Sequence, residues 1–187
     1  MEQPQAAPQE NFTSFFIDTL INFAIAVILF VLIYVLVAVP HKVDGSSMLP
    51  SFFHGDYLLT EKVTRLWDDY DYGESIVFYY PKDTSKRFIK RVIALPHDTI
   101  KLSQGMVYIN DLPLDEPYIK GDPTTGHRFL SEDEPYTLGD HEYFVMGDNR
   151  SGSSDSREWG PVSRDLIVGK VFFRYWPLSR LGLIERF

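Results

Sequence analysis

The chain has 187 residues, of which 44% are hydrophobic, and its formal net charge at pH 7 is −8. This length suits one globular domain with a membrane segment. The negative charge argues against a nucleic-acid-binding protein, which needs clustered Lys and Arg to neutralise phosphates. The absence of cysteine excludes a disulfide framework, a thiol nucleophile and a cysteine-ligated zinc site. We expect no metal and no cofactor.

The first predicted element is a membrane segment. An apolar run covers residues 17–39, with its polar residues near the start, and it follows a polar tail at residues 1–16. A helix of this length spans about 34 Å, which is enough to cross a hydrocarbon core of roughly 30 Å. Pro40 is expected to end the helix. A cleavable signal peptide is the alternative, but the tail lacks the Lys or Arg of a basic n-region, so a retained anchor is favoured.

The rest of the chain, residues 41–187, is predicted to be mostly β. Short segments rich in β-branched and aromatic residues are separated by Gly, Pro, Asn and Asp, a pattern typical of strands and turns. Residues 111–140 are acidic and rich in Pro and Gly, which indicates loops or a small inserted subdomain. Many short strands without helices favour a barrel or a sandwich. The predicted strands are 57–63, 75–80, 87–95, TIKLSQ with MVYIN within 99–110, 141–147 and 167–176.

Two adjacent serines, Ser46 and Ser47, stand in the sequence GSSMLP just after the apolar run. A serine nucleophile needs a neighbouring base, because its hydroxyl is weakly nucleophilic at neutral pH. The G-x-S-x-G turn of α/β-hydrolases requires Gly two places after the serine, whereas Leu49 stands two places after Ser47. On these residues alone a capped turn is the simpler interpretation.

The segment KRFIKRVIALPHD places a lysine on an apolar strand face. Alternate strand residues share a face, so Lys90 lies with Phe88 and Val92, while Arg87 and Arg91 can point away. Burial disfavours the charged form of lysine, and a base near neutral pH requires its pKa to fall by roughly two to three units. A lysine that reaches solvent from an amphipathic strand is the alternative.

The third candidate segment, GDNRSGSSDSREWG at residues 147–160, is dense in hydrogen-bond donors and acceptors. A calcium-binding EF-hand loop is excluded, because Arg150 stands at the third ligand position counted from Asp148 and no Glu stands at the twelfth. A buried amine needs hydrogen-bond partners in either protonation state. The candidates for that support are Ser153, Ser154, Asp155 and Arg157.

These three segments, in this order behind one membrane segment, resemble bacterial type I signal peptidases, which are membrane-bound Ser/Lys proteases that remove signal peptides. The resemblance covers nearly the whole chain from residue 40 onward. It implies a mostly β, signal-peptidase-like antiparallel β-barrel or sandwich with one N-terminal transmembrane helix, and a small inserted cap region at about residues 96–141. The matching segments are GSSMLPSF, GDYLLTEK, GESIVFYYP, FIKRVIALPHD, VYIN, VMGDNRSGSSDSREWGPV and VGKVFFRYWP.

The resemblance also implies residue roles. The family pattern Ser-Met-x-Pro places the nucleophile directly before Met, which selects Ser47 rather than Ser46, and the lysine of the KR pair, Lys90, corresponds to the general base. The backbone N–H of Ser47 is expected to donate to the oxyanion. Some members add a serine hydroxyl two residues earlier, where this chain has Gly45. The residues that match the catalytic support are Ser153, Asp155 and Arg157.

The implied substrates are secretory preproteins, cut after small residues at −1 and −3 in an Ala-x-Ala pattern. The implied location is the plasma membrane, spanned once, with the catalytic domain on the extracytoplasmic side; the lipid bilayer and the protein-translocation machinery are the further partners. Charge alone weakly favours the opposite orientation, because the tail is acidic whereas His41 and Lys42 follow the apolar run. The expected substrate-binding residues are Val43, Gly45, Met48, Phe52, Leu58, Phe88 and Ile89.

Four other interpretations stay open. A catalytically inactive membrane-anchored β-domain that binds partners would be favoured by an ordinary pKa at Lys90. A Ser/Lys self-cleaving repressor-type protease would need a DNA-binding domain where the membrane segment stands. An organellar inner-membrane peptidase of the same superfamily fits the chemistry equally well. A Ser-His-Asp hydrolase would use one of five histidines outside any recognisable motif, namely His41, His54, His97, His127 and His141.

Overall fold

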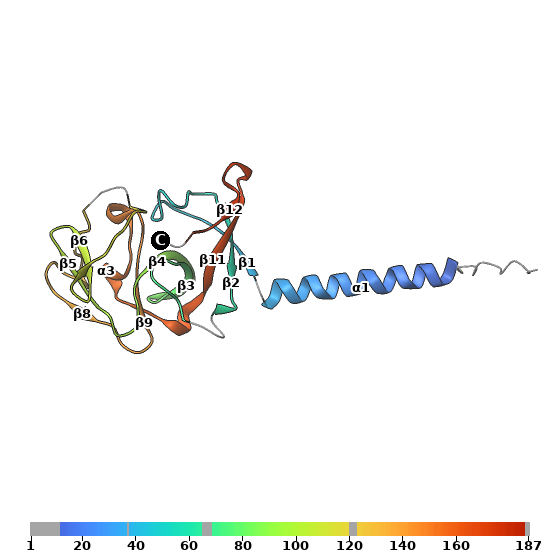
Figure 1. Cartoon of the computed structure of the whole chain (residues 1–187), viewed down its shortest axis with the longest axis horizontal. Coiled ribbons are helices and arrows are strands. Elements are labelled where there is room, and N and C mark those ends of the chain that lie inside the picture. Colours follow the sequence, from blue (N-terminus) through green and yellow to red (C-terminus); the bar gives the residue numbers. More distant parts are fainter. Residues whose placement is uncertain (1–11, 37, 65–68, 120–122, 186–187) are drawn as a thin grey trace, which may run out of the picture. The chain divides into compact units, whose positions relative to one another are not determined.

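The computed structural model describes residues 12–36, 38–64, 69–119 and 123–185, and the chain divides into two units, residues 1–37 and residues 38–187. The first unit holds one helix, α1 (Phe12–Leu36), whose apolar side chains are exposed (Figure 1). Within it, Thr13–Leu32 has a mean hydropathy of 2.5 and no buried residue. By length and composition, this helix is able to cross a membrane.

The bounds of α1 differ from the predicted segment 17–39. The helix ends at Leu36, and strand β1 (Ala38–Lys42) follows, so Val39 and Pro40 take strand positions opposite β2 (Tyr57–Glu61). Pairing with β2 gives the backbone of this segment its hydrogen bonds outside the helix. Pro40 is tolerated because β1 lies at the edge of its sheet, where a missing N–H breaks no ladder.

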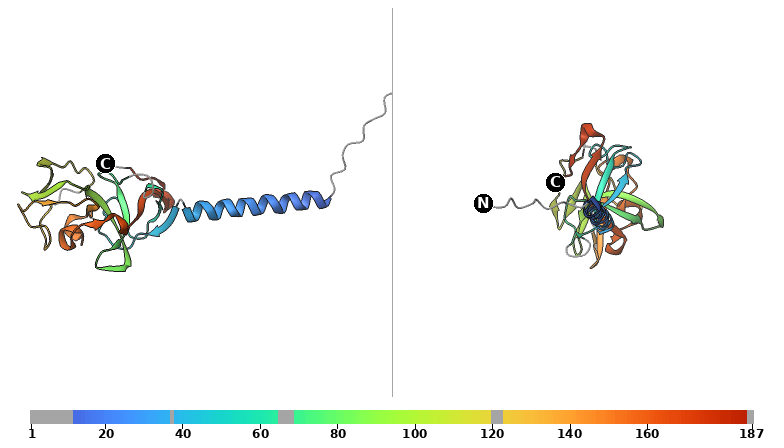
Figure 2. Two further views of the ribbon diagram at one scale, coloured as in Figure 1. Left: turned by 90° about the horizontal axis from the view of Figure 1, so that it is seen from below. Right: turned by 90° about the vertical axis from the view of Figure 1, so that its right-hand side faces the viewer.

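The main sheet of the second unit has 8 strands, in the order β1-β2-β11-β3-β4-β9-β10, with β12 paired to β11 (Figures 1 and 2). Each of these pairings is antiparallel. Two predicted strands, 75–80 and 167–176, coincide with observed ones. The remaining bounds are β3 (Ser75–Tyr80), β4 (Asp83–Ala94), β9 (Glu142–Met146), β10 (Val162–Ser163), β11 (Ile167–Trp176) and β12 (Gly182–Leu183).

A second sheet of 4 strands has the order β7-β6-β5-β8 and lies at the end of this unit remote from β1 and β2 (Figures 1 and 2). The two predicted segments within 99–110, TIKLSQ and MVYIN, form a hairpin, because Gln104 and Gly105 have φ of 52° and 79° and form the tight turn between them. The sheet falls within the span 96–141. Its strands are β5 (Thr99–Ser103), β6 (Met106–Ile109), β7 (Leu112–Pro113) and β8 (Tyr136–Thr137).

The predicted fold class, mostly antiparallel β with one N-terminal apolar helix, is confirmed. Buried apolar side chains form three clusters, of which one lies around β5, β6 and β9, one around Phe78 and Trp159, and one beneath residues 43–52. Short helical turns complete the described part of the domain. They are η1 (Arg150–Gly152), α3 (Ser156–Trp159), η2 (Arg164–Leu166) and η3 (Leu178–Arg180).

Candidate active site

Ser47 lies in the connection between β1 and β2, which two buried side chains fasten to the domain. Met48 and Phe52 are each 1% exposed and pack in one cluster with Leu58. Burial of a side chain of this size stabilises the fold by about 1.5–3 kcal/mol. These contacts hold the segment that carries Ser47, which is half-buried, whereas Ser46 is exposed.

A second segment, which directly follows β9, holds the backbone of both serines. The backbone N–H of Asn149 donates to Ser47 O at 3.1 Å, and its side-chain amide donates to Ser46 O at 3.1 Å. Gly147 packs so closely against Ser47 O and Ser153 Oγ that an added Cβ would overlap both. Gly147 and Asn149 were not among the predicted site residues, although both belong to the Gly-Asp-Asn run that follows a predicted strand.

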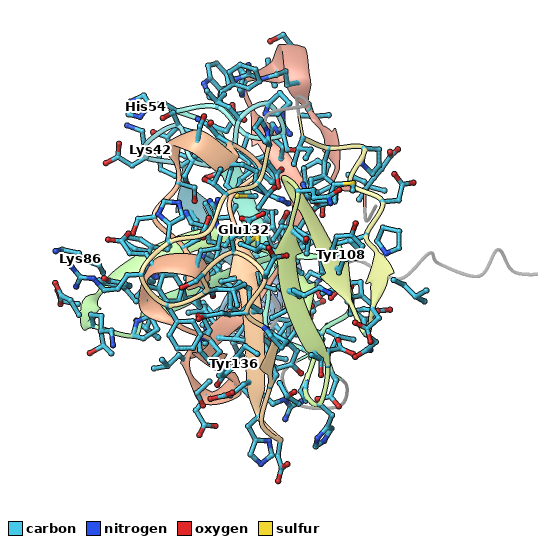
Figure 3. The ribbon with its side chains drawn as sticks, turned by 90° about the vertical axis from the view of Figure 1, so that its left-hand side faces the viewer. Lys42, His54, Lys86, Tyr108, Glu132 and Tyr136 are labelled. Carbon is cyan, nitrogen blue, oxygen red and sulfur yellow. The ribbon has the colours of Figure 1, made fainter. Side chains whose placement is uncertain are left out.

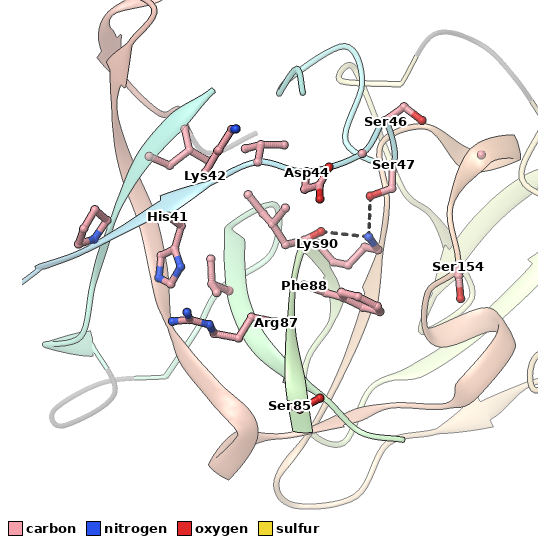
Figure 4. Close-up of a pocket in the computed structure, with 17 residues that line it drawn as sticks. His41, Lys42, Asp44, Ser46, Ser47, Ser85, Arg87, Phe88, Lys90 and Ser154 are labelled. Atoms are coloured by element: carbon pink, nitrogen blue, oxygen red, sulfur yellow. Dashed lines mark hydrogen bonds between the residues drawn. The ribbon is translucent and has the colours of Figure 1, made fainter. Parts of the chain in front are cut away.

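Lys90 extends from β4 to Ser47. Its side chain is 4% exposed, and its Nζ lies 2.7 Å from Ser47 Oγ and donates to Ile89 O at 3.1 Å (Figure 4). Burial lowers the pKa of Lys90 to about 8, although the charges of Asp155 and Asp148 raise it. A neutral amine at this position offers its lone pair to the Ser47 hydroxyl proton.

Asp155 and Arg157 form a fully buried ion pair behind this site. Nε and Nη2 of Arg157 each donate to one Asp155 oxygen at 2.8 Å, and both side chains are 0% exposed. Asp155 also accepts the Gly147 N–H at 3.0 Å. Burial raises the pKa of Asp155, but the hydrogen bonds and charge of Arg157 outweigh it and hold that pKa below its usual value. The pair therefore supports the segment that contacts Ser47.

Within the described ranges, no hydrogen bond joins Ser153 to the Lys90 amine, so its supporting role stays a prediction. The hydrogen bonds of Lys90 Nζ go to Ser47 and Ile89. Ser153 Oγ is buried against Gly147 and faces the Asp155 carboxylate, whose pKa it helps to lower. Ser154 lies at the surface, where its hydroxyl donates to Glu158 at 2.5 Å.

A further buried ion pair, absent from the predicted site, joins β4 to the Gly-Asp-Asn segment. Arg91 donates to Asp148 through Nε at 2.8 Å and Nη2 at 2.6 Å, and the two side chains are 1% and 0% exposed. Arg91 Nη1 also donates to Gly73 O at 2.7 Å. Because Arg91 follows Lys90 directly, this pair fixes the strand that carries the lysine. A charge is rarely buried without such a partner.

Ser47 and Lys90 line a cleft of about 610 Å³. Its walls include β1, which pairs only with β2, and the first half of β4, which pairs with β9 only from Arg91 onward. Five predicted substrate-binding residues line the cleft, namely Val43, Gly45, Leu58, Phe88 and Ile89. Met48 and Phe52 are not in its lining, because their apolar side chains are buried in the core below the nucleophile.

The histidines do not form a Ser-His pair in the described part of the chain, where Ser47 Oγ is hydrogen-bonded to Lys90 alone. His41 lines the cleft, and burial, with the charges of Arg87 and Lys62, lowers its pKa to about 4. His54 is exposed, and its Nδ1 accepts the Gly45 N–H at 3.3 Å and lies 3.1 Å from Asp44. The Ser-His-Asp interpretation is therefore not supported by these contacts.

The sequence is similar to those of known proteins over most of its length. The family "Signal peptidase, peptidase S26" matches residues 16–176. The chain is 41% identical over 165 residues to a probable signal peptidase I-2 of Synechocystis sp., covering 85% of this chain and 72% of that protein. It is 31% identical over 176 residues to signal peptidase IB of Staphylococcus aureus, covering 87% and 91% respectively.

Among solved structures, a signal peptidase I from Enterococcus faecalis V583 matches with a TM-score of 0.46 and 28% identity, covering 55% of this chain and 97% of that one. The family match covers most of the chain, and the relatives exceed 30% identity over most of their own length. This chain therefore belongs to the signal peptidase family, peptidase S26, and is a serine endopeptidase of the signal peptidase I type.

Proposed function

We propose that the protein is a membrane-anchored endopeptidase that removes signal peptides from exported preproteins, with Ser47 as nucleophile and Lys90 as general base. The observation that carries this proposal is the 2.7 Å separation of Lys90 Nζ from Ser47 Oγ. Nζ is buried and its pKa is lowered to about 8. A fraction of the lysine is therefore neutral near physiological pH and able to take a proton.

The reaction begins with acylation. Lys90 Nζ takes the proton of Ser47 Oγ, and the oxygen attacks the carbonyl carbon after the signal peptide. The backbone N–H of Ser47 donates to the oxyanion that forms. When the tetrahedral intermediate collapses, Lys90 returns the proton to the leaving amine, which becomes the N-terminus of the mature protein. The signal peptide remains as an ester of Ser47.

Deacylation repeats the proton transfers with water as the nucleophile. Lys90, neutral again, removes a proton from a water molecule, and the resulting hydroxide attacks the ester. Ser47 Oγ takes the proton back as it leaves. Gly45 has no side chain to donate a second hydrogen bond to the oxyanion, so the donor that some relatives place at this position is missing here.

The substrate is proposed to bind as an added strand. The cleft lies between the outer edge of β1 and the first half of β4, whose backbone groups on this side pair with no strand in the described ranges. An extended peptide gains main-chain hydrogen bonds at such edges, and side-chain pockets then give specificity. The shallow apolar floor that would accept small residues at −1 and −3 consists of Val43, Leu58, Val77 and Ile89.

The proposed arrangement in the cell follows from the anchor. Residues 1–16 would lie in the cytoplasm, the apolar segment would span the membrane, and the domain at residues 41–187, with its small cap region, would lie on the extracytoplasmic side. Ser47 follows the apolar run by eight positions, so an extended chain reaches at most about 28 Å from it. The nucleophile therefore works close to the bilayer, where a substrate's apolar segment and the translocation machinery would be found.

The experiment is cleavage of a preprotein by the full chain in detergent, with the new N-terminus determined by sequencing. We expect a single cut after Ala-x-Ala and at least a hundredfold loss in kcat/KM when Phe replaces Ala at −1, because a large ring does not fit a shallow pocket. A matched substrate with Phe at −2 shows whether the loss is specific to −1, because the −2 side chain points to the opposite side of an extended strand. Equal loss at −1 and −2 would contradict the binding mode, and no cleavage at all would contradict the function.

A further inference from the structure

A second hollow of about 420 Å³ lies outside the catalytic cleft. It is lined by aromatic side chains together with two exposed cations and one carboxylate, namely Tyr80, Lys82, Arg128, Phe129, Glu158 and Trp159. Three separate segments build it: the turn after β3, residues 128–129, and α3. The backbone N–H of Phe129 donates to Arg157 O at 2.8 Å, so the loop with Arg128 is fastened to the same short helix that supports the active site.

Two contacts connect this hollow to the catalytic cleft. Phe88 lines the cleft, and its ring stacks on that of Tyr80 with a centroid distance of 4.7 Å. Ser154 also lines the cleft, and its hydroxyl donates to Glu158 at 2.5 Å. A peptide that leaves the cleft past Phe88 and Ser154 therefore meets the hollow next.

The hollow lies a few residues from the reacting bond. Lys90 Nζ is 5.5 Å from the centroid of the Phe88 ring, and that ring is 4.7 Å from Tyr80. The Tyr80 ring is thus no more than about 10 Å from Nζ, the length of roughly three residues of an extended strand. A substrate residue three positions from the cut would reach it.

The direction in which a bound preprotein runs through the cleft follows from the residues at its two ends. Figure 4 shows His41 and Arg87 on one side of the Ser47–Lys90 pair and Ser154 on the other, with the Phe88 ring beside Lys90 between them. The unpaired strand edges and the shallow apolar floor lie on the His41 side, which suits the small residues before the cut. The residues after the cut, which begin the mature protein, then pass Phe88 and Ser154.

The charges of the hollow select the chemistry of its occupant. Lys82 and Arg128 are exposed and form no ion pair with any residue of the described ranges. Glu158 is the one carboxylate in the lining, and it is already engaged by Ser154. Two available cations suit a carboxylate on the substrate.

We propose that this hollow is a subsite for the mature part of the preprotein, which favours an acidic side chain about three residues after the cut and disfavours a basic one. The proposal rests on the proposed function, because it needs a preprotein in the cleft. It adds a preference for a residue after the scissile bond, whereas the −1 and −3 positions lie before it. The preference acts in binding, since Lys82 and Arg128 do not touch the reacting atoms.

The test uses the full chain and a set of fluorogenic signal-peptide substrates with Asp, Asn or Lys at one of the first five positions after the cut. We expect the substrate with Asp at the third position to be cleaved with a kcat/KM about three to ten times that of the substrate with Lys there. This is the range expected for one or two exposed ion pairs. The difference should lie in KM and shrink at high salt. A set that is cleaved without any dependence on charge at positions two to four overturns the inference but not the proposed function.

Variants separate the hollow from general surface charge. In the double variant Lys82→Gln/Arg128→Gln, the Asp-to-Lys ratio should fall to within a factor of two, and in Lys82→Glu/Arg128→Glu it should invert. Lys86→Gln is the matched control, because Lys86 pairs with Asp83, points outward on the same strand connection and does not line the hollow (Figure 3). A ratio that persists in both double variants contradicts the inference, and a wild type that cleaves none of the set contradicts the proposed function as well.

Discussion

At the scale of single residues, the site depends on the environment of one amine. Side chains alternate between the two faces of β4, and Lys90 lies on the buried face. Burial lowers its pKa to about 8, while the charges of Asp155 and Asp148 oppose that shift. In the proposed mechanism the neutral amine is the base, so the active fraction of enzyme rises with pH. At pH 7 roughly a tenth of the lysine is neutral, which is sufficient for catalysis.

The pH dependence of cleavage follows with a definite sign. We expect log kcat/KM to rise with a slope of one as pH increases, and to level off near pH 8, where Lys90 loses its proton. Initial rates between pH 5.5 and 9.5 measure it, with fluorescence or circular dichroism as the control for folding at each pH. A rate that is flat across pH 6 to 9 would contradict a buried lysine base.

At the scale of elements, the active site is the meeting point of the β1–β2 connection, β4 and the segment after β9. Gly147 and Asn149 contact the backbone of Ser47, and two buried ion pairs, Arg91–Asp148 and Asp155–Arg157, anchor that segment. Breaking such a pair by removing one partner typically costs about 3–5 kcal/mol, because the other charge is left buried. The position of Ser47 is therefore set in part by residues that do not line the cleft.

Gly147→Ala tests this arrangement. The added methyl group overlaps Ser47 O and Ser153 Oγ, so it must displace the backbone that carries the nucleophile. A displacement of about 1 Å costs roughly a hundredfold in rate, and we expect a loss of at least this size in kcat with a folded protein. Gly182→Ala is the control, since nothing lies within 4 Å of a Cβ there. Equal activity of the two variants would show that the close contact at Gly147 is unimportant.

The sequence predicts some of these elements well and others poorly, for physical reasons. β3 and β11 are recognisable because β-branched and aromatic residues run between clear turn residues. β1 was missed because its apolar residues continue the membrane segment without a break, and only pairing with β2 separates them. The spatial contacts of Gly147, Asn149 and Arg91 join segments far apart in the chain, which local pattern does not reveal. The pair of Ser47 and Lys90 came from the family resemblance.

At the scale of the whole molecule, the chain combines an apolar helix with a β-rich unit that carries the catalytic cleft. The apolar side chains of α1 are exposed along the helix, and a large exposed apolar surface marks a site that binds a membrane or another protein. We therefore expect the full chain to stay with lipid vesicles after a high-pH wash that removes peripheral proteins.

Charges placed in the helix test the anchor. The double variant Ile25→Asp/Leu29→Asp should be released by the wash, because each central Asp costs about 2.5–3.5 kcal/mol on insertion scales. The conservative pair Ile25→Leu/Leu29→Ile is the control and should be retained. Release of the wild type, or retention of the Asp variant, would contradict a membrane-spanning role for α1.

We propose one assay to test whether Ser47 and Lys90 act as nucleophile and base. Four full-length proteins are compared on one Ala-x-Ala preprotein substrate: wild type, Ser46→Ala, Ser47→Ala and Lys90→Ala. We expect kcat/KM to fall by at least about a thousandfold in the last two, since either loss disables the same chemical step, and to change by less than a few fold in Ser46→Ala. Cleavage by Ser47→Ala at the wild-type rate, or loss of activity confined to Ser46→Ala, would contradict the assignment.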